Sequence, residues 1–391
     1  MRRIWYPLGY QIRHGGHILH VISPAERPTA HSGVTVHASI TPGGPAGMML
    51  VVETDEDAPD PAAVVAAFGL GGEPTTFAAV GGAWSNRVYR LDAAGHRFAV
   101  KEMRNPWAES RWQDWLAEAW AFEQQAIAAG VPAPRPVPNP ADGQCLAWVS
   151  RRDPARPRAA VRVHHWADGK PLSPGPTTPE TARWAGRILA ILHGLQIRPR
   201  DRSVFPVPST ETARRWPELS EAAHAAHAPW ADLLTAATSA VSLIADLACS
   251  AGYHPEHEVM THGDIDQKNL IDTTRGPVLC DWDVAAPLVP RRELADVAVS
   301  LARWDDMGVA REVVRSYRQA GGDATRVEPS DLGQPLMIGL DWVAFNVERA
   351  IGLRPATAAQ ARVAGELAPG LLAAIPGQTR LALRAGDLVN P

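Results

Sequence analysis

The chain has 391 residues, of which 46% are hydrophobic and 20% charged, so a chain that is disordered throughout is excluded. Its formal net charge is −4, whereas nucleic-acid-binding proteins typically carry an excess of positive charge. Cys145, Cys249 and Cys280 stand far apart, which argues against a disulfide framework and a structural zinc site. No apolar run approaches the roughly 20 residues that span a bilayer. We therefore expect a cytoplasmic protein with no nucleic-acid or membrane partner.

Residues 1–58 differ in pattern from the rest of the chain. Two arginines follow the first residue, but polar residues interrupt the apolar ones after them, so no continuous signal-peptide core follows. Pro, Gly, His and Ser then recur over residues 22–47 without a sustained period. These features predict a flexible N-terminal extension over residues 1–58.

A helix and a hairpin are expected next. Residues 62–68 predict a short helix that ends at Gly69, and residues 75–80 predict a strand. The strand enters the glycine pair Gly81-Gly82, and a polar tip with Ser85 and Asn86 leads into a second strand. Backbone at glycine can approach a phosphate closely because no side chain blocks it. Taken alone, a glycine pair between two strands is more often an ordinary hairpin.

The following segment predicts a strand and a helix that both carry charged residues. Residues 97–103 form a short apolar run with Lys101 near its end, and a helix is expected over residues 114–129. This helix carries two glutamates, Glu118 and Glu123. Strands over residues 145–150 and 160–165 would complete a small antiparallel sheet. Farther on, helical patterns cover residues 181–195, 211–251, 297–303, 311–320 and 336–351.

Residues 261–271 and 278–283 carry the strongest chemical signal. Asp264 follows His262 and Gly263, Asn269 comes five residues later, and Asp281 ends the next apolar run. A carboxylate that orients a hydroxyl and two oxygen ligands for a hard cation suit phosphoryl transfer. Asp and Asn are also common in turns and caps, so the stretch alone could be two ordinary loops. A zinc site that uses the three histidines at positions 254, 257 and 262 is disfavoured because no fourth ligand matches.

This order and spacing resembles the aminoglycoside phosphotransferase family, the kinase-like enzymes that include choline-kinase-type proteins. Their loops contain His-Gly-Asp, four variable residues, Asn, and an apolar strand that ends in Asp-Trp or Asp-Phe. The resemblance implies an α+β, two-lobed, protein-kinase-like fold. Its small nucleotide-binding N-lobe, with an antiparallel sheet and a helix, would cover residues 59–166. A larger, mostly helical C-lobe for catalysis and acceptor binding would cover residues 167–391.

The resemblance also implies roles for individual residues. Asp264 would be the catalytic base, Asn269 and Asp281 would hold Mg²⁺, and Lys101 would bind the phosphates of ATP, with GTP as an alternative donor. Glu118 would be the acidic partner of Lys101, with Glu123 as the competing assignment. The remaining nucleotide-binding residues would be Gly81, Gly82, Ser85 and Asn86 in the covering loop and His165 in the linker between the lobes.

Several alternatives stay open at this point. The family usually shows Asp-Pro-x-x-Asp-Leu-Ala after the metal loop, and here either Glu293 or Asp296 can take the place of the last aspartate. By family analogy the acceptor is a hydroxyl of an aminoglycoside-type antibiotic, with a choline or amino-sugar type of metabolite as the alternative. A non-catalytic nucleotide-binding pseudokinase is the rival of another class. The sequence implies no obligatory protein partner.

Overall fold

The computed structural model describes residues 57–81, 86–104, 111–323 and 326–388. Local sequence signals define its first helix and the strands that follow. Helix α1 (Pro61–Phe68) begins after Asp60, whose carboxylate accepts a hydrogen bond from the Ala62 N–H at 3.1 Å. It ends at Gly69 with a φ of 59°, a left-handed conformation that glycine adopts without strain. The helix and the strand that the sequence predicts here are confirmed.

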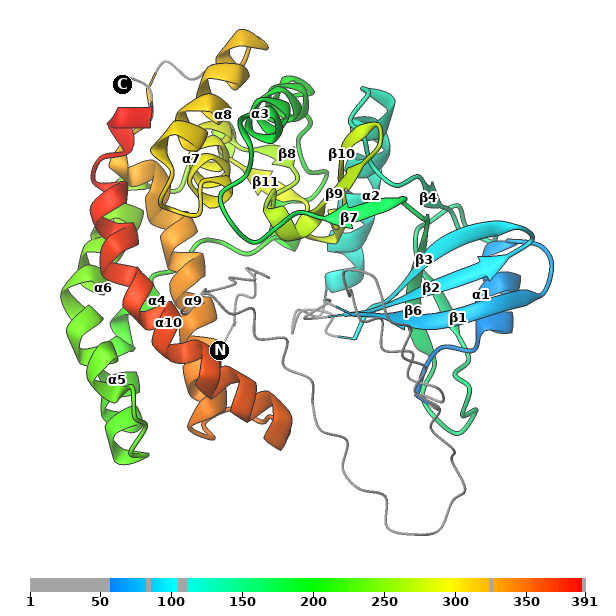
Figure 1. Ribbon diagram of the computed structural model, residues 1–391, viewed down its shortest axis with the longest axis horizontal. Coiled ribbons are helices and arrows are strands. Elements are labelled where there is room, and N and C mark those ends of the chain that lie inside the picture. The colour runs from blue at the N-terminus through cyan, green and yellow to red at the C-terminus, as the bar shows by residue number, and fades with distance from the viewer. Residues whose placement is uncertain (1–56, 82–85, 105–110, 324–325, 389–391) are drawn as a thin grey trace, which may run out of the picture.

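An antiparallel sheet forms the small lobe (Figure 1). Its strand order is β1-β2-β3-β6-β4, and β5 also pairs with β6. Its inner face packs against α1 in a small apolar core around Val64, Phe68, Leu91 and Val161. The strands are β1 (Pro74–Val80), β2 (Arg87–Ala93), β3 (His96–Glu102), β4 (Pro136–Val137), β5 (Ala147–Val149) and β6 (Ala159–His165).

Helix α2 (Trp112–Ala128) belongs to the small lobe by sequence but packs into the core of the large lobe. Its residues Trp115 and Phe122 are almost fully buried there. The Trp115 indole N–H donates to the Ala285 carbonyl at 2.9 Å, and the Phe122 ring lies 6.0 Å from the ring of Trp282. The helix is therefore fixed directly to the segment that follows Asp281.

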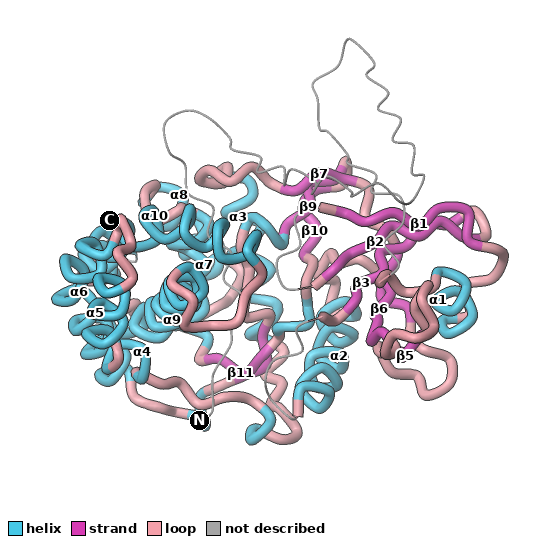
Figure 2. Tube along the Cα trace, turned by 90° about the horizontal axis from the view of Figure 1, so that it is seen from below, coloured by secondary structure: helices cyan, strands magenta, loops and turns pink. Residues whose placement is uncertain are grey.

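Two short sheets lie where the lobes meet. Strand β9 (Leu270–Thr273) pairs with both β10 (Gly276–Leu279) and β7 (Gly169–Pro171), and β8 (Val259–Thr261) pairs with β11 (Ala286–Leu288). Figure 2 shows β7, β9 and β10 between the strand-rich lobe and the helical lobe. A Cβ atom at Gly169 would lie 2.3 Å from the Asp272 carbonyl oxygen, so only glycine permits this approach.

Helices make up most of the large lobe, so the two-lobed α+β fold that the sequence predicts is confirmed (Figure 1). The helices are α3 (Pro179–Gly194), α4 (Glu211–Arg214), α5 (Trp216–Ala225), α6 (Ala231–Ala251), α7 (Pro290–Leu301), α8 (Met307–Gln319), α9 (Gly333–Ala350) and α10 (Ala358–Ala382). Short 3₁₀ turns cover Arg202–Val204, Pro255–His257, Gln267–Asn269, Trp282–Val284, Pro329–Leu332 and Ala385–Leu388.

Helix α10 was not predicted from the sequence. It contains Pro369 and Pro376, and each proline lacks the N–H that would continue the helical ladder. The helix packs against α9 and α6 and buries Leu371, Leu372 and Ile375 in the large core. Tertiary packing therefore outweighs the local helix-breaking signals.

Helix α6 is long and apolar enough, by length and composition, to cross a membrane. Its buried residues Leu234, Val241 and Ile244 recur at helical spacing along one face, and the helix contacts α5, α9 and α10. One buried stripe on an otherwise exposed helix is the pattern of a helix that packs on the side of a protein core.

We predict that Gly186→Ala destabilises the protein by about 1–3 kcal/mol, because the added methyl group overpacks the contact between α3 and α8. Its Cβ would lie 2.3 Å from the Val313 carbonyl oxygen and 2.8 Å from the Tyr317 nitrogen. Gly194→Ala is the matched control in the same helix, since nothing lies within 4 Å of its added Cβ. Urea denaturation of the two variants measures the difference, and equal unfolding midpoints would contradict the prediction.

Candidate active site

The loop from β8 to β9 places Asp264 between two fixed ends. Gly263 adopts a φ of 77°, and a Cβ atom there would lie 3.3 Å from the Val284 carbonyl oxygen, so glycine suits this turn. After Asp264, the 3₁₀ turn Gln267–Asn269 is capped by the Asp266 carboxylate, which accepts from the Gln267 N–H at 2.5 Å. The Gln267 amide donates to the Gly175 and Leu301 carbonyls, each at 3.1 Å. The loop is thus held at both ends.

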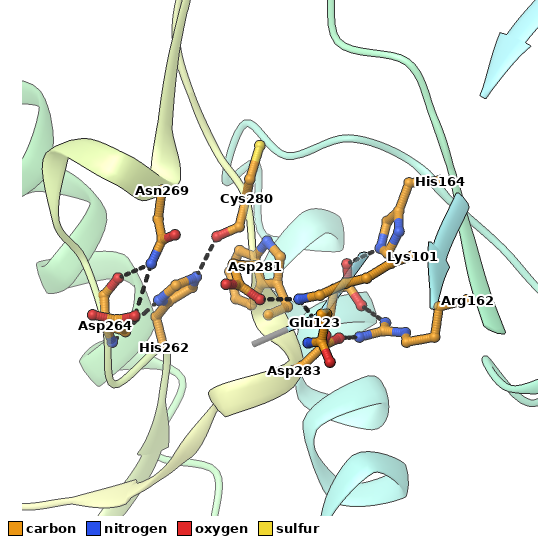
Figure 3. Close-up of polar contacts among 12 residues, drawn as sticks. Lys101, Glu123, Arg162, His164, His262, Asp264, Asn269, Cys280, Asp281 and Asp283 are labelled. Carbon is orange, nitrogen blue, oxygen red and sulfur yellow. Dashed lines mark hydrogen bonds and ion pairs between the residues drawn. The ribbon is translucent and has the colours of Figure 1, made fainter. Parts of the chain in front are cut away.

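Asp264 is buried and both of its carboxylate oxygens have partners. Oδ2 accepts from the Asn269 amide at 2.9 Å, and Oδ1 lies 2.7 Å from the Lys268 ammonium (Figure 3 shows the Asn269 contact). Burial raises the pKa of Asp264 to about 6, although the nearby Lys268 ammonium acts in the opposite direction. At neutral pH the group is therefore an ionised carboxylate with a pKa suited to accepting a proton.

His262 supports the backbone of the loop. Its buried imidazole lies 2.9 Å from the Cys280 carbonyl through Nε2, while Nδ1 accepts the Asp264 N–H at 3.3 Å. Burial lowers the pKa of His262, which favours a neutral ring with the proton on Nε2. The contacts agree with a loop-holding role for His262. His254 and His257 lie instead on an exposed turn with Glu256, away from this ring.

Glu293 takes the supporting position that the sequence left open between Glu293 and Asp296. Its carboxylate accepts from the Gly263 N–H at 2.8 Å and from the Thr261 hydroxyl, and it lies 2.6 Å from the Nε2 atom of His193. Burial alone would raise the pKa of Glu293, but the His193 contact and the other hydrogen bonds lower it. An ionised Glu293 thus ties α7 and α3 to the catalytic loop.

Asp296 has a different environment. Its carboxylate accepts from the Ser300 hydroxyl at 3.3 Å, and no cation contacts it among the residues that the structure describes. Burial and the nearby Asp264 carboxylate raise the pKa of Asp296 to about 7. Asp264, Asp266 and Asp296 therefore form an acidic group in which Lys268 is the neighbouring cation.

Lys101 lies against the two aspartates that follow β10. Its ammonium contacts the Asp281 carboxylate and lies 2.5 Å from Oδ2 of Asp283 (Figure 3). Burial alone would raise the pKa of Asp281, but the Lys101 ammonium outweighs burial and lowers it. Asp281 itself has a φ of 67° and a ψ of 50°, a left-handed conformation that is uncommon for residues other than glycine. This backbone turn directs its carboxylate toward Lys101.

The expected ion pair between Lys101 and Glu118 is wrong. Glu118 lies on another face of α2, where its carboxylate is 3.1 Å from the Arg200 guanidinium and accepts the Arg200 N–H at 3.2 Å. The competing residue Glu123 is fully buried and points toward the sheet. It does not contact Lys101 either. Its two carboxylate oxygens lie 2.6 Å from the Arg162 guanidinium and 3.0 Å from Nε2 of His164.

Arg162 is a site residue that the sequence reasoning missed. It lies opposite Lys101 in the pairing of β3 with β6, and its buried guanidinium contacts Glu123 on one side and Asp283 on the other. The result is a chain of contacts from Glu123 through Arg162 and Asp283 to Lys101 (Figure 3). The available signal was a charged residue inside the otherwise apolar strand Ala159–Val163.

The expected nucleotide-binding loop is described only in part. Gly82 and Ser85 lie outside the described residues, whereas Gly81 is exposed and the Asn86 side chain accepts the Arg104 N–H at 3.2 Å. In the linker, the N–H groups of His165 and Trp166 already donate to the Arg135 and Arg97 carbonyls. A nucleotide base at this linker must therefore meet other backbone groups, and the roles of Gly81, Asn86 and His165 stay predictions.

Asn269 and Asp281 each carry an oxygen donor suitable for a hard cation, and the Cys280 N–H next to Asp281 donates to the Asn269 carbonyl at 2.8 Å. The Asn269 amide nitrogen is used by Asp264, which leaves its oxygen for a metal, and the Asp281 carboxylate already holds a positive charge in the form of Lys101. A neutral amide oxygen and a carboxylate are the donor types that Mg²⁺ prefers. The residues present therefore fit the expected metal.

The two lobes, with Lys101 of the small lobe against Asp281 of the large lobe, are the arrangement of a kinase-like protein. The profile of the family described as "Phosphotransferase enzyme family" (APH) matches residues 76–329. The chain belongs to this phosphotransferase family. No curated protein matches it by sequence.

Solved structures support the same fold. A spectinomycin phosphotransferase in complex with ADP and spectinomycin superposes with a TM-score of 0.58 at 12% identity, covering 80% of this chain and 95% of that one. A microcompartment-associated aminopropanol kinase gives 0.56 at 19% identity, covering 79% and 94%. An amicoumacin kinase in complex with AMP-PNP, Ca²⁺ and Ami gives 0.54 at 13% identity, covering 78% and 89%. At these identities the likeness concerns the fold.

We predict that Arg162→Met lowers the free energy of unfolding by about 3–5 kcal/mol, because it leaves the buried Glu123 carboxylate without its main counter-charge. Arg362→Ala is the control: it removes an exposed ion pair with Glu366 and should change stability by less than about 1 kcal/mol. Chemical denaturation of both variants checks this. A loss below 1 kcal/mol in Arg162→Met would show that the buried network does not hold the lobes together.

Proposed function

We propose that the protein transfers the γ-phosphoryl group of ATP to a hydroxyl group of a small molecule. The observation that carries the proposal is the geometry at Asp264: a buried carboxylate is fixed by Asn269 and Lys268, and the loop after the next strand brings Asp281 against Lys101 of β3. Phosphoryl transfer depends mainly on such positioning and on electrostatic stabilisation. GTP stays open as an alternative donor.

In this proposal each residue has one task. The acceptor hydroxyl donates a hydrogen bond to Asp264, its oxygen forms a bond to the γ-phosphorus, and the bond from that phosphorus to the bridging oxygen breaks to release ADP. Asp264 takes the proton of the hydroxyl. Asn269 and Asp281 would hold Mg²⁺, which neutralises charge on the phosphate oxygens when bound. Lys101 would leave the aspartates and bind phosphate.

The acceptor that we propose first is an aminoglycoside-type antibiotic, and resistance to it would be the biological outcome. The acidic group of Asp264, Asp266 and Asp296 supports a cationic acceptor, because Asp296 has no cation among the described residues. The same feature suits a small amino alcohol, so a metabolite kinase is the alternative; one structural neighbour is an aminopropanol kinase. We further propose a cytoplasmic setting, with which three free thiols accord.

We predict that the rate of phosphate transfer falls about tenfold per pH unit below about pH 6. The pKa of Asp264 is raised to about 6, so the carboxylate is the active form above that pH and protonation removes the base below it. Initial rates of ADP release between pH 4.5 and 8 measure this profile. A rate that stays constant down to pH 5 would remove Asp264 as the base.

We predict that Asp264→Asn abolishes transfer while nucleotide binding persists. The amide keeps the shape of the side chain but cannot take the proton, so kcat should fall by at least about 10²-fold. An acceptor screen that measures ADP release finds the substrate, and a Mg²⁺-dependent rise of Tm with nucleotide measures binding. Turnover at the wild-type rate by Asp264→Asn would exclude this mechanism. Absence of any nucleotide-dependent stabilisation in the wild type would instead favour a pseudokinase.

A further inference from the structure

Lysine is rare in this chain, and its distribution is uneven. The sequence contains three lysines against 35 arginines, so nearly all positive charge outside the active site is carried by arginine. Two of the three lysines, Lys101 and Lys268, contact aspartates of the candidate site, and Lys170 is exposed on β7. Lysine presents a compact ammonium on a flexible stem, whereas arginine presents a planar fork. Two of the three lysines therefore place an ammonium group against aspartates of the candidate site.

The position of Lys268 relative to the base is defined by the short turn that carries it. Its Nζ atom lies 2.7 Å from Oδ1 of Asp264 and 3.6 Å from Oδ2 of Asp266. Asn269 binds the other oxygen of Asp264. A hydroxyl that is hydrogen-bonded to Asp264 would lie about 2.6–3.2 Å from the carboxylate, and the phosphorus that it attacks about 3–3.5 Å farther on. The flexible lysine stem allows the ammonium to reach the oxygens of that phosphoryl group.

We propose that Lys268 is a second phosphate-binding lysine, whose ammonium contacts the γ-phosphoryl group of the nucleotide as it moves to the acceptor. The inference rests on the proposed kinase function. Lys101 contacts Asp281 and Asp283 beside β3, while Lys268 contacts Asp264 itself, so the two ammonium groups would bind the phosphates from different sides. Preorganised cations of this kind stabilise the charge that is spread over the three equatorial oxygens during transfer.

The reaction itself releases Lys268 from its present partner. Before transfer, Asp264 is ionised and holds the ammonium; when Asp264 accepts the hydroxyl proton, it becomes neutral and the ion pair weakens. The negative charge at that moment lies on the phosphoryl group, so it attracts the Lys268 ammonium more strongly than the neutral Asp264 does.

A purely structural role for Lys268 is less consistent with the loop. The 3₁₀ turn is already fixed by the Asp266 cap, by Gln267 on two carbonyls and by Asn269 on Asp264. The Lys268 ammonium contacts one oxygen of Asp264, while the Asn269 amide already holds the other oxygen, so the position of the carboxylate does not depend on the lysine alone. The turn therefore has sufficient support without the lysine.

The test compares Lys268→Met with Lys268→Arg, and uses Lys170→Met as the matched control at an exposed lysine. Binding of Mg-ADP and of Mg-AMP-PNP to the full chain is measured by calorimetry, and kcat with the acceptor found in the screen. We expect Lys268→Met to bind ADP as the wild type does, to bind AMP-PNP severalfold more weakly, and to lose on the order of 10²-fold in kcat. Lys268→Arg should recover only part of that loss, and Lys170→Met should match the wild type.

Two results would overturn the inference. One is an unchanged preference for AMP-PNP over ADP in Lys268→Met, because a contact with the γ-phosphoryl group must affect only the nucleotide that carries it. The other is a fall in kcat that is matched by an equal loss of ADP binding and of Tm, which would indicate collapse of the loop. The binding comparison needs no turnover, so it decides the role of Lys268 even if no acceptor is phosphorylated. Absent turnover in the wild type would count against the proposed function instead.

Discussion

The arrangement of the site depends on the Asp283 carboxylate, which is shared by two cations from neighbouring strands. Lys101 and Arg162 lie side by side on β3 and β6, and both reach Asp283, which follows Asp281 in the metal loop. Arg162 continues the contact to Glu123 on α2. A buried charge is costly unless it is paired, so these groups must be assembled together. The sheet, the helix and the metal loop consequently take one mutual arrangement.

The position of the Asp264 loop in the large lobe depends on a second buried acid, Glu293. Glu293 receives hydrogen bonds from Thr261 and Gly263 on one side and contacts His193 on the other. Asp264 directly follows Gly263, so α7 and α3 help to place it in addition to its own loop. The two acids have separate tasks. Asp283 connects the two lobes through its contacts with Lys101 and Arg162, and Glu293 connects the Asp264 loop to the helical core. Both accept from groups that the sequence places far away.

The sequence predicted the fold and the order of the site well, because those depend on periodicity and on local spacing. Asn269 donates to the Asp264 carboxylate, and Asp281 lies against Lys101. The partner of Lys101 could not be derived in this way: Glu118 and Glu123 lie on the same helix, and only tertiary packing decides which face meets the sheet. Arg162 was missed for the same reason, since its partners are 39 and more residues away. Helix α10 was missed because its prolines signal an end that packing overrides.

The strand β7 makes the linker between the lobes part of the same sheet as the metal loop. Pro171 pairs with Ile271 in β9, and β9 begins directly after Asn269. Gly169 approaches the Asp272 carbonyl too closely for any other residue, so β7 and β9 are tightly packed at this junction. A shift of the linker on binding a nucleotide base would therefore displace the strand that directly follows Asn269, a proposed metal ligand. Binding of the nucleotide base at the linker and positioning of Asn269 beside the phosphates would then occur together.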